Sequence, residues 1–237
     1  GFLYVDGGHQ ATNTTINSNG YLRVYGGGSA TDTTINSGGT QYVYSGGSAT
    51  NTTLNSGGIQ SVSSGGSATS TTINSGGYLS VDGGGSAVGI TQNSGGTIFA
   101  DTDATLSGTN INGSFSIAGG SASNMLLENN GRLEVFSGHQ ATNTTINSGG
   151  YLWVSSGGSA TDTTINSGGI QSVSSGGSAT DTTINSGGKL SVDGGGSAVG
   201  ITQNSGGAIW TSTSASMSGT NINGSFSIAG GSASNML

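Results

Sequence analysis

Apolar and polar side chains alternate along this chain in short runs that return at a fixed interval. One unit reads G-x-L-x-V-x-x-G-G-S-A-x-x-T-x-I-N-S-G, and copies begin at Gly20, Gly39 and Gly58, nineteen residues apart. Successive side chains of a strand point to opposite faces. Leu22 and Val24 are therefore expected to face inward, and the side chains beside them outward.

Each unit contains a second strand-like run after a pair of turn glycines. Ala30 is the first small inward residue of this run, a three-residue step bends the path, and Thr33 and Ile35 form a second inward pair. An Asn-Ser-Gly corner then closes the unit. A repeat of this length cannot bury its apolar face alone, so the units must stack, strand over strand.

The repeat predicts an all-β fold, a right-handed parallel β-helix (solenoid) of about 12 coils. Right-handed winding is the usual hand of parallel crossover connections. We expect a single β-helical domain over residues 1–237, with coils of nineteen residues over 1–95 and 131–206. Residues 96–130 and 207–237 are expected to form shortened coils in the same frame.

The shortened coils keep the alternation but carry larger residues. Leu106 and Met217 stand where other coils have Ala, as expected if side-chain volume offsets a shorter turn. A longer repeat is superimposed, since residues 58–126 recur at 169–237, shifted by 111 positions. The inward residues expected for the two shortened coils are Ile98, Ala100, Leu106, Thr109 and Ile111, then Phe115, Ile117, Ala122, Met125 and Leu127.

Two sets of amide side chains are expected to bond between coils. Gln41 and Gln60 occupy the inward Leu position, and Gln92 and Gln203 the inward Ile position, where buried amides need partners. The corner asparagines should form a ladder of stacked amides. This ladder is expected to contain Asn36, Asn55, Asn74 and Asn93, and then Asn147, Asn166, Asn185 and Asn204.

The composition supports a folded β protein and excludes several functions. The 237 residues include 49 Gly, no Pro and no Cys, and 5% of them are charged. Disordered chains usually carry more charge and fewer of the β-branched residues that are abundant here. A net charge of −7, with three cationic side chains, argues against nucleic acid as a partner. The lack of Cys excludes disulfides and thiolate chemistry.

Targeting segments are not recognisable in the sequence. It contains no apolar run near the roughly 18 residues that span a bilayer, and no signal sequence precedes Gly1. Both ends of the chain fall inside the repeat. We therefore expect the chain to be a piece of a longer protein whose targeting segments lie elsewhere.

One acidic cluster is the best candidate for catalysis or metal binding. Asp82 and Asp101 occupy the same outward position of adjacent coils, with Asp103 nearby, and paired carboxylates can bind a hard cation or hydrolyse a glycosidic bond. The internal copy of this region has serine at two of the three positions, Ser212 and Ser214. The sequence therefore predicts no catalytic residue, no metal site and no cofactor, and a β-helical polysaccharide-active enzyme is the alternative.

The two histidines do not suggest a site. His9 and His139 stand in the same G-H-Q-A-T context, far apart along the repeat, where each replaces a turn glycine. No serine has a His or acidic partner in register, so a nucleophilic triad is unsupported.

Serines recur at two outward positions, although serine is also an ordinary turn residue. The first set, the Ser29 row, precedes the inward Ala and contains Ser29, Ser48, Ser67, Ser86, Ser159, Ser178 and Ser197. The second set, the Ser37 row, lies at the Asn-Ser-Gly corner and contains Ser37, Ser56, Ser75, Ser94, Ser148, Ser167, Ser186 and Ser205. Both rows are expected to expose their hydroxyl groups.

Aromatic side chains gather at outward positions of a few coils. Such a group suggests a contact surface for another chain or for a sugar. Stacking between coils that only supports the sheet is the alternative. The candidate interaction surface consists of Tyr4, Tyr21, Arg23, Tyr25, Tyr42, Tyr44, Phe136, Tyr151 and Trp153.

The segments GGSATDTTINSGGYLWVSSGG and GGSATNTTLNSGGIQSVSSGG resemble the nineteen-residue repeats in passenger domains of AIDA-type self-associating autotransporters of Gram-negative bacteria. The resemblance covers nearly the whole chain. It implies a β-helical adhesin on the bacterial cell surface, anchored in the outer membrane through a C-terminal translocator that is absent from this fragment.

The resemblance also implies function and partners. It implies autoaggregation through passengers on neighbouring cells, biofilm formation, and attachment to and invasion of host cells. A cytoplasmic heptosyltransferase would add O-linked heptose to exposed serines before export. A passive stalk that presents a distal binding domain remains a further alternative, and repetition would in either case supply length and many weak contacts.

Overall fold

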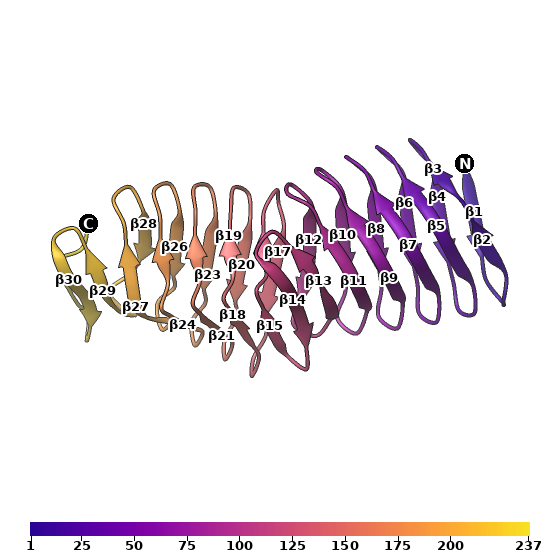
Figure 1. Cartoon of the computed structure of the whole chain (residues 1–237). Helices are drawn as coiled ribbons and strands as arrows, with labels where there is room; N and C mark the ends of the chain where they lie inside the picture. Colours follow the sequence, from indigo (N-terminus) through magenta and orange to yellow (C-terminus); the bar gives the residue numbers. More distant parts are fainter. The chain divides into compact units, whose positions relative to one another are not determined.

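The structure is a computed structural model that describes residues 1–237, and all of its regular elements are β-strands. Two compact units are present, Gly1–Gly119 and Gly120–Leu237, and each is a stack of coils in which strands lie over strands (Figure 1). The predicted all-β solenoid with a spacing of nineteen residues is confirmed. The expectation of one continuous domain stays a prediction.

In the first unit, two sheets face each other. The Leu-Val sheet is parallel and follows the order β1 (Phe2–Val5), β4 (Tyr21–Val24), β6 (Thr40–Val43), β8 (Ile59–Val62), β10 (Tyr78–Val81) and β12 (Thr97–Asp101). The Ala-Ile sheet contains β2 (Gln10–Thr12), β3 (Thr15–Ile16), β5 (Ser29–Ile35), β7 (Ser48–Leu54), β9 (Ser67–Ile73), β11 (Ser86–Gln92), β13 (Thr105–Asn110) and β14 (Gly113–Ala118).

The second unit repeats this arrangement. Its Leu-Val sheet follows the order β17 (Arg132–Val135), β20 (Tyr151–Val154), β23 (Ile170–Val173), β26 (Lys189–Val192) and β28 (Ala208–Thr211). Its Ala-Ile sheet contains β15 (Ser121–Ser123), β16 (Leu126–Leu127), β18 (Gln140–Thr142), β19 (Thr145–Ile146), β21 (Ser159–Thr161), β22 (Thr164–Ile165), β24 (Ser178–Thr180), β25 (Thr183–Ile184), β27 (Ser197–Gln203), β29 (Ser216–Asn221), β30 (Gly224–Ala229) and β31 (Ser232–Ser234).

The core is a set of columns rather than a single cluster. Leu22, Val24, Ala30, Thr33 and Ile35 are all buried, as the alternation predicts. Each residue lies directly over its equivalent in the next coil, nineteen positions along the chain. Full burial of one such Val, Leu or Ile side chain contributes roughly 1.5–3 kcal/mol, so stability accumulates coil by coil.

The three-residue step between the inward Ala and Thr is made by a residue with positive φ. Asp32, Asn51 and Ser70 occupy this position in successive coils with φ values of 56°, 57° and 58°. Asn and Asp tolerate this left-handed conformation better than other residues with a side chain. The frequent Asn and Asp at this position are the sequence signal for the bend.

The two glycines of each turn pair are required for different physical reasons. Gly65 has a positive φ of 73°, which favours glycine. Gly66 has an ordinary φ, but a Cβ there would lie 2.5 Å from the carbonyl oxygen of Val43 in the preceding coil. The second glycine therefore sets how closely two coils approach.

Gly66→Ala is expected to lower the free energy of unfolding by about 1–3 kcal/mol, because the methyl group forces neighbouring backbones apart. Gly26→Ala is the matched control, since a Cβ there would meet nothing closer than 3.4 Å and its φ is not positive. The control should change stability by less than about 0.5 kcal/mol. Urea denaturation followed by circular dichroism measures both, and equal effects would contradict the role given to Gly66.

Buried glutamines bond between coils in the first unit, as predicted. Gln60 Nε2 donates to Gln41 Oε1 at 2.9 Å and to Thr52 Oγ1 at 3.2 Å, while Thr71 Oγ1 donates to Gln60 Oε1 at 2.9 Å. Gln92 and Gln203 are also buried, but each donates to a backbone carbonyl four residues later at 2.9 Å, so these two bonds lie within one coil and not between coils as expected.

Gln171 is a buried glutamine that the sequence prediction missed. It lies between Leu152 and Leu190 of the adjacent coils. Its Oε1 accepts a hydrogen bond from Thr182 at 3.3 Å, and its Nε2 has no partner. A buried donor without a partner is costly.

Gln171→Leu should raise the free energy of unfolding by about 1 kcal/mol, because it removes the unpaired donor and completes a leucine column. Gln60→Leu should lower it by about 1–3 kcal/mol, because three hydrogen bonds are lost and their partners stay buried. Denaturation curves of the two variants test this contrast. A gain in both, or a loss in both, would contradict the account of these side chains.

The asparagine ladder is confirmed in both units. Asn55 Nδ2 donates to Asn36 Oδ1 at 2.8 Å, and Asn185 Nδ2 donates to Asn166 Oδ1 at 2.7 Å. The remaining predicted rungs have donor–acceptor distances of 2.8 to 3.0 Å. Asn17 extends the ladder by one rung, because it accepts from Asn36 at 2.8 Å.

The prediction that Thr109 and Ile111 point inward is wrong. Both are exposed. Thr109 lies over Thr91, an exposed residue of β11, after a register shift in this parallel pair, and Ile111 lies in the turn of the antiparallel hairpin β13–β14. Asn110 Oδ1 accepts from the backbone of Asn112 at 2.8 Å in the turn, and Gly113 follows with a φ of 112°. The hairpin β29–β30 repeats this geometry in the second unit.

The other inward residues of the shortened segments are confirmed. They are buried, and they are Ile98, Ala100, Leu106, Phe115, Ile117, Ala122, Met125 and Leu127. Leu106 lies over Ala87 and Met217 over Ala198, as the substitution of larger residues predicts.

Candidate interaction surfaces

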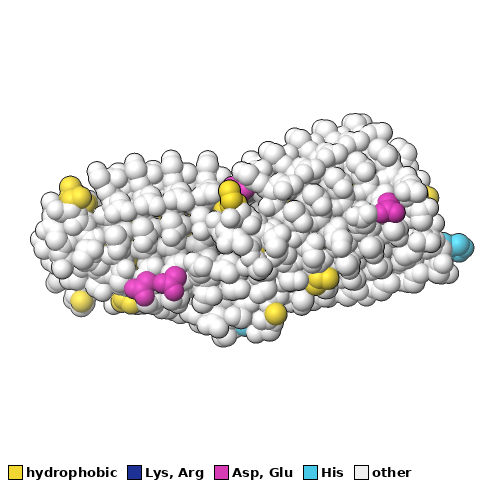
Figure 2. All heavy atoms as spheres, in the orientation of Figure 1, with side chains coloured by type: hydrophobic (Ala, Val, Ile, Leu, Met, Phe, Trp, Pro, Cys, Tyr) yellow, Lys and Arg dark blue, Asp and Glu magenta, His cyan; other side chains and the backbone are white.

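Most of the surface is uncharged and polar. Figure 2 shows a face on which Asp, Glu, His and apolar side chains are scattered among the white atoms of the backbone and other side chains. The 237 residues include only three cationic and 10 acidic side chains. Surface chemistry therefore depends on rows of hydroxyl and amide groups and on a few aromatic residues.

The aromatic residues of the first unit stack across successive coils of the Leu-Val sheet. Ring centroids are 5.2 Å apart for Phe2 and Tyr21 and 4.8 Å apart for Tyr25 and Tyr44, with planes within 9° of parallel. Two further stacked pairs, Tyr4 with Tyr25 and Tyr21 with Tyr42, have centroid separations of 6.3 and 6.4 Å. The structure thus brings these predicted surface residues together as one patch.

Arg23 lies within this aromatic patch. Its guanidinium carbon is 5.6 Å from the ring centroid of Tyr4 and 5.8 Å from that of Tyr42, within the range of cation–π attraction. A hydrogen bond with Tyr25 raises the pKa of Arg23 above its ordinary value. The patch therefore combines stacked rings and tyrosine hydroxyls with one permanent positive charge.

The second unit has a smaller aromatic group, held by different contacts. Arg132 donates to Glu134 at 2.8 Å and lies 4.8 Å from the ring centroid of Trp153. Tyr151 meets Trp153 edge to face, and Trp153 Nε1 donates to Ser174 Oγ at 2.8 Å. Phe136 directly follows β17 and is partly exposed. The predicted surface is therefore two groups, one in each unit.

The two predicted serine rows differ in exposure. Every member of the Ser37 row is exposed, whereas every member of the Ser29 row is only partly exposed. The corner backbones run in register, since Gly38 N donates to Gly57 O at 3.0 Å and Gly57 N to Gly76 O at 2.8 Å. The Ser37 row is therefore a straight column of accessible hydroxyl groups in each unit.

A third row of serines was missed by the sequence prediction. Four of these residues precede the glycine pair of the other turn and Ser137 precedes Gly138-His139, so the recurring Ser-Gly is the signal that could have identified them. All are exposed, and they are Ser45, Ser64, Ser137, Ser156 and Ser175.

The acidic cluster does not form a metal-binding group. The backbone nitrogen of Asp103 donates to Asp101 Oδ1 at 2.9 Å, and no group of three or more His, Asp or Glu side chains is arranged to hold a metal ion. Burial raises the pKa of Asp101, the nearby Asp103 charge adds to this effect, and hydrogen bonds from backbone groups oppose it. In the second unit, Ser212 and Ser214 hydrogen-bond to each other at 2.7 Å.

The histidines occupy turns, as expected. His9 is exposed, and its Nδ1 lies 2.8 Å from the carbonyl oxygen of Asp6. His139 lies in the other unit, partly buried.

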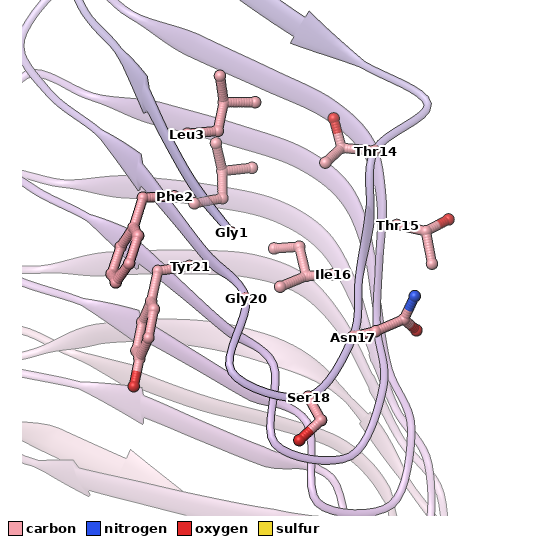
Figure 3. Close-up of a pocket in the computed structure, with 11 residues that line it drawn as sticks. Gly1, Phe2, Leu3, Thr14, Thr15, Ile16, Asn17, Ser18, Gly20 and Tyr21 are labelled. Carbon is pink, nitrogen blue, oxygen red and sulfur yellow. The ribbon is translucent and has the colours of Figure 1, made fainter.

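A hollow of about 320 Å³ lies at the first coil of the first unit. Leu3 and Ile16 face each other across it, while Phe2 and Tyr21 lie together on its outer side (Figure 3). The rest of the lining includes Thr14, Thr15, Asn17, Ser18 and Leu22, and Tyr21 is its one titratable side chain. The hollow therefore adjoins the apolar columns at the first coil.

Comparison with known proteins identifies a family. The family model described as "Adhesin of bacterial autotransporter system, probable stalk" matches residues 4–58, 39–96, 107–169 and 157–207. The chain is 45% identical to a solved hyper-glycosylated fragment of TibA, modified by TibC, over 91% of this chain and 93% of that one, with a TM-score of 0.46. The comparison with curated proteins gave no match. No helix with the length and apolar character needed to cross a membrane is present.

Proposed function

Because the chain belongs to the AIDA family of bacterial autotransporter adhesins, we propose that it is a passenger that mediates autoaggregation, biofilm formation, and attachment to and invasion of host cells. It acts on the cell surface, anchored in the outer membrane through a C-terminal translocator. Its role is adhesive and not enzymatic.

The observation that carries this proposal is the regular stacking of identical outward positions. Each surface group recurs coil after coil at about 4.7–4.9 Å, so two copies that align at one coil align at many. Single contacts between hydroxyls, amides and rings are weak, but linked contacts gain strength through effective concentration.

The aromatic groups are proposed as the adhesive parts of this surface. Tyr4 is 55% exposed although it stacks on Tyr25, so stacking supports the sheet and still leaves ring edges and hydroxyl groups for a partner. Aromatic residues with a polar end are enriched in protein interfaces. Residues of the two groups contact either the same surface of a passenger on a neighbouring cell or the host cell.

Cells displaying the passenger with Tyr4, Tyr21, Tyr25, Tyr42 and Tyr44 changed to Ser should no longer clump, because the proposed adhesive patch is removed. Tyr78→Ser is the matched control, since Tyr78 lies on the same sheet outside the stacked patch and should leave clumping intact. Settling of mixed cell suspensions measures clumping, with surface display checked by antibody. Unchanged clumping in the fivefold variant would show that the aromatic patch is not adhesive.

A second candidate function, that of a passive stalk presenting a distal binding domain, is favoured by the word "stalk" in the family description. The same clumping assay separates the two functions. Added soluble chain should block clumping if its own surface is adhesive, and should have no effect if it is only a spacer.

Glycosylation of exposed serines by a cytoplasmic heptosyltransferase before export is also part of the proposal. Transfer needs a hydroxyl that reaches solvent, and the Ser37 row meets this condition better than the Ser29 row. O-linked heptose on these serines would add further hydroxyl groups to the aligned surface.

Intact-mass analysis of the chain produced together with the transferase should show increments of one heptose. Replacing the Ser37 row by Ala should remove more increments than replacing the Ser29 row, because the hydroxyls of the Ser29 row are less accessible. Finding no heptose on any serine would discard this part of the proposal without affecting the clumping experiment.

A further inference from the structure

One outward column of the Leu-Val sheet has the same order of side chains in both units. In the second unit Trp153, Ser172, Ser191 and Trp210 lie on four successive coils. In the first unit the corresponding residues are Tyr42, Ser61, Ser80 and Phe99. Each unit therefore has two serines between two aromatic side chains.

The two tryptophans of the second unit are held in place by neighbouring polar groups. Trp153 is fixed by its hydrogen bond to Ser174 and by Arg132 over its ring. The ammonium nitrogen of Lys189 lies 3.0 Å from the ring centroid of Trp210, which is nevertheless 62% exposed. Three coil spacings separate the two tryptophans, a span of about 14 Å.

A hollow of about 260 Å³ adjoins Trp210. It is lined by Ser191, Asp193 and Gly194 from one coil and by Trp210, Thr211 and Ser212 from the next. Hydroxyl groups and one exposed carboxylate thus border the aromatic ring.

We propose that this column is a binding site for a neutral oligosaccharide. One face of a pyranose ring is a flat layer of C–H bonds that stacks on an aromatic ring, while its hydroxyl groups point outward. Serine hydroxyls can donate to and accept from such hydroxyls, and the Asp193 carboxylate accepts from them. Lys189 is engaged with Trp210, and Arg132 with Glu134 and Trp153, and so an acidic sugar would meet Asp193 without a free counter-charge.

The internal duplication supports a binding role over a purely structural one. Positions 111 apart keep their serines unchanged, but the aromatic residues change from Tyr42 to Trp153 and from Phe99 to Trp210. Aromatic character is kept while size and shape vary. Asp82 and Asp193 also correspond, so both units place a carboxylate beside the second serine.

The site can be tested by fluorescence because it contains both tryptophans of the chain. The complete chain is titrated with cellohexaose, maltohexaose, laminarihexaose and mannohexaose, and with an acidic oligogalacturonate for comparison. At least one neutral oligosaccharide should give a saturable change in tryptophan emission. Trp210→Ala, followed through Trp153 or by calorimetry, should weaken binding about tenfold or more.

Ile222→Ala is the matched control, since Ile222 is also exposed in the second unit but lies in the β29–β30 turn, away from the column. It should bind as tightly as the unchanged chain. Absence of binding to every neutral oligosaccharide, binding to the acidic one alone, or equal affinity in Trp210→Ala would overturn the proposal. Trp210 is outside the aromatic patch of the first unit, so these results are independent of the clumping experiment.

Discussion

The structure depends on the close stacking of one coil on the next through backbone hydrogen bonds. At the corners, glycine backbones bond in register from coil to coil, as between Gly38, Gly57 and Gly76. At the other turn, the approach leaves no space for a Cβ at positions such as Gly66. A chain folded this way needs glycine at fixed intervals, and this need explains both the composition and the period.

Stacking in register gives every position of the repeat one fixed environment. Inward positions become columns of Leu, Val, Ala and Ile, and inward or corner amides bond to their equivalents, as Gln60 does with Gln41 and Asn55 with Asn36. Outward positions become rows of the same chemical group. The interactions that stabilise the fold and the surface proposed to be adhesive therefore come from the same geometric rule.

Differences between coils are where particular functions can reside. The aromatic patch around Arg23 and the column from Trp153 to Trp210 interrupt an otherwise hydroxyl-rich surface. Both use the sheet as a rigid support, so ring positions are set by backbone register. A surface of repeated weak contacts and a few local aromatic sites can serve adhesion and ligand binding together.

The sequence by itself determined the repeat, the inward columns and the asparagine ladder, because a period of two within a period of nineteen fixes which side chains share a face. Tertiary structure alone decided that β13 and β14 form an antiparallel hairpin, which leaves Ile111 exposed. Alternation is the same in parallel and antiparallel pairs, so it cannot identify the partner strand. The unpaired amide of Gln171 and the contact of Lys189 with Trp210 likewise depend on neighbours that only the folded chain brings together.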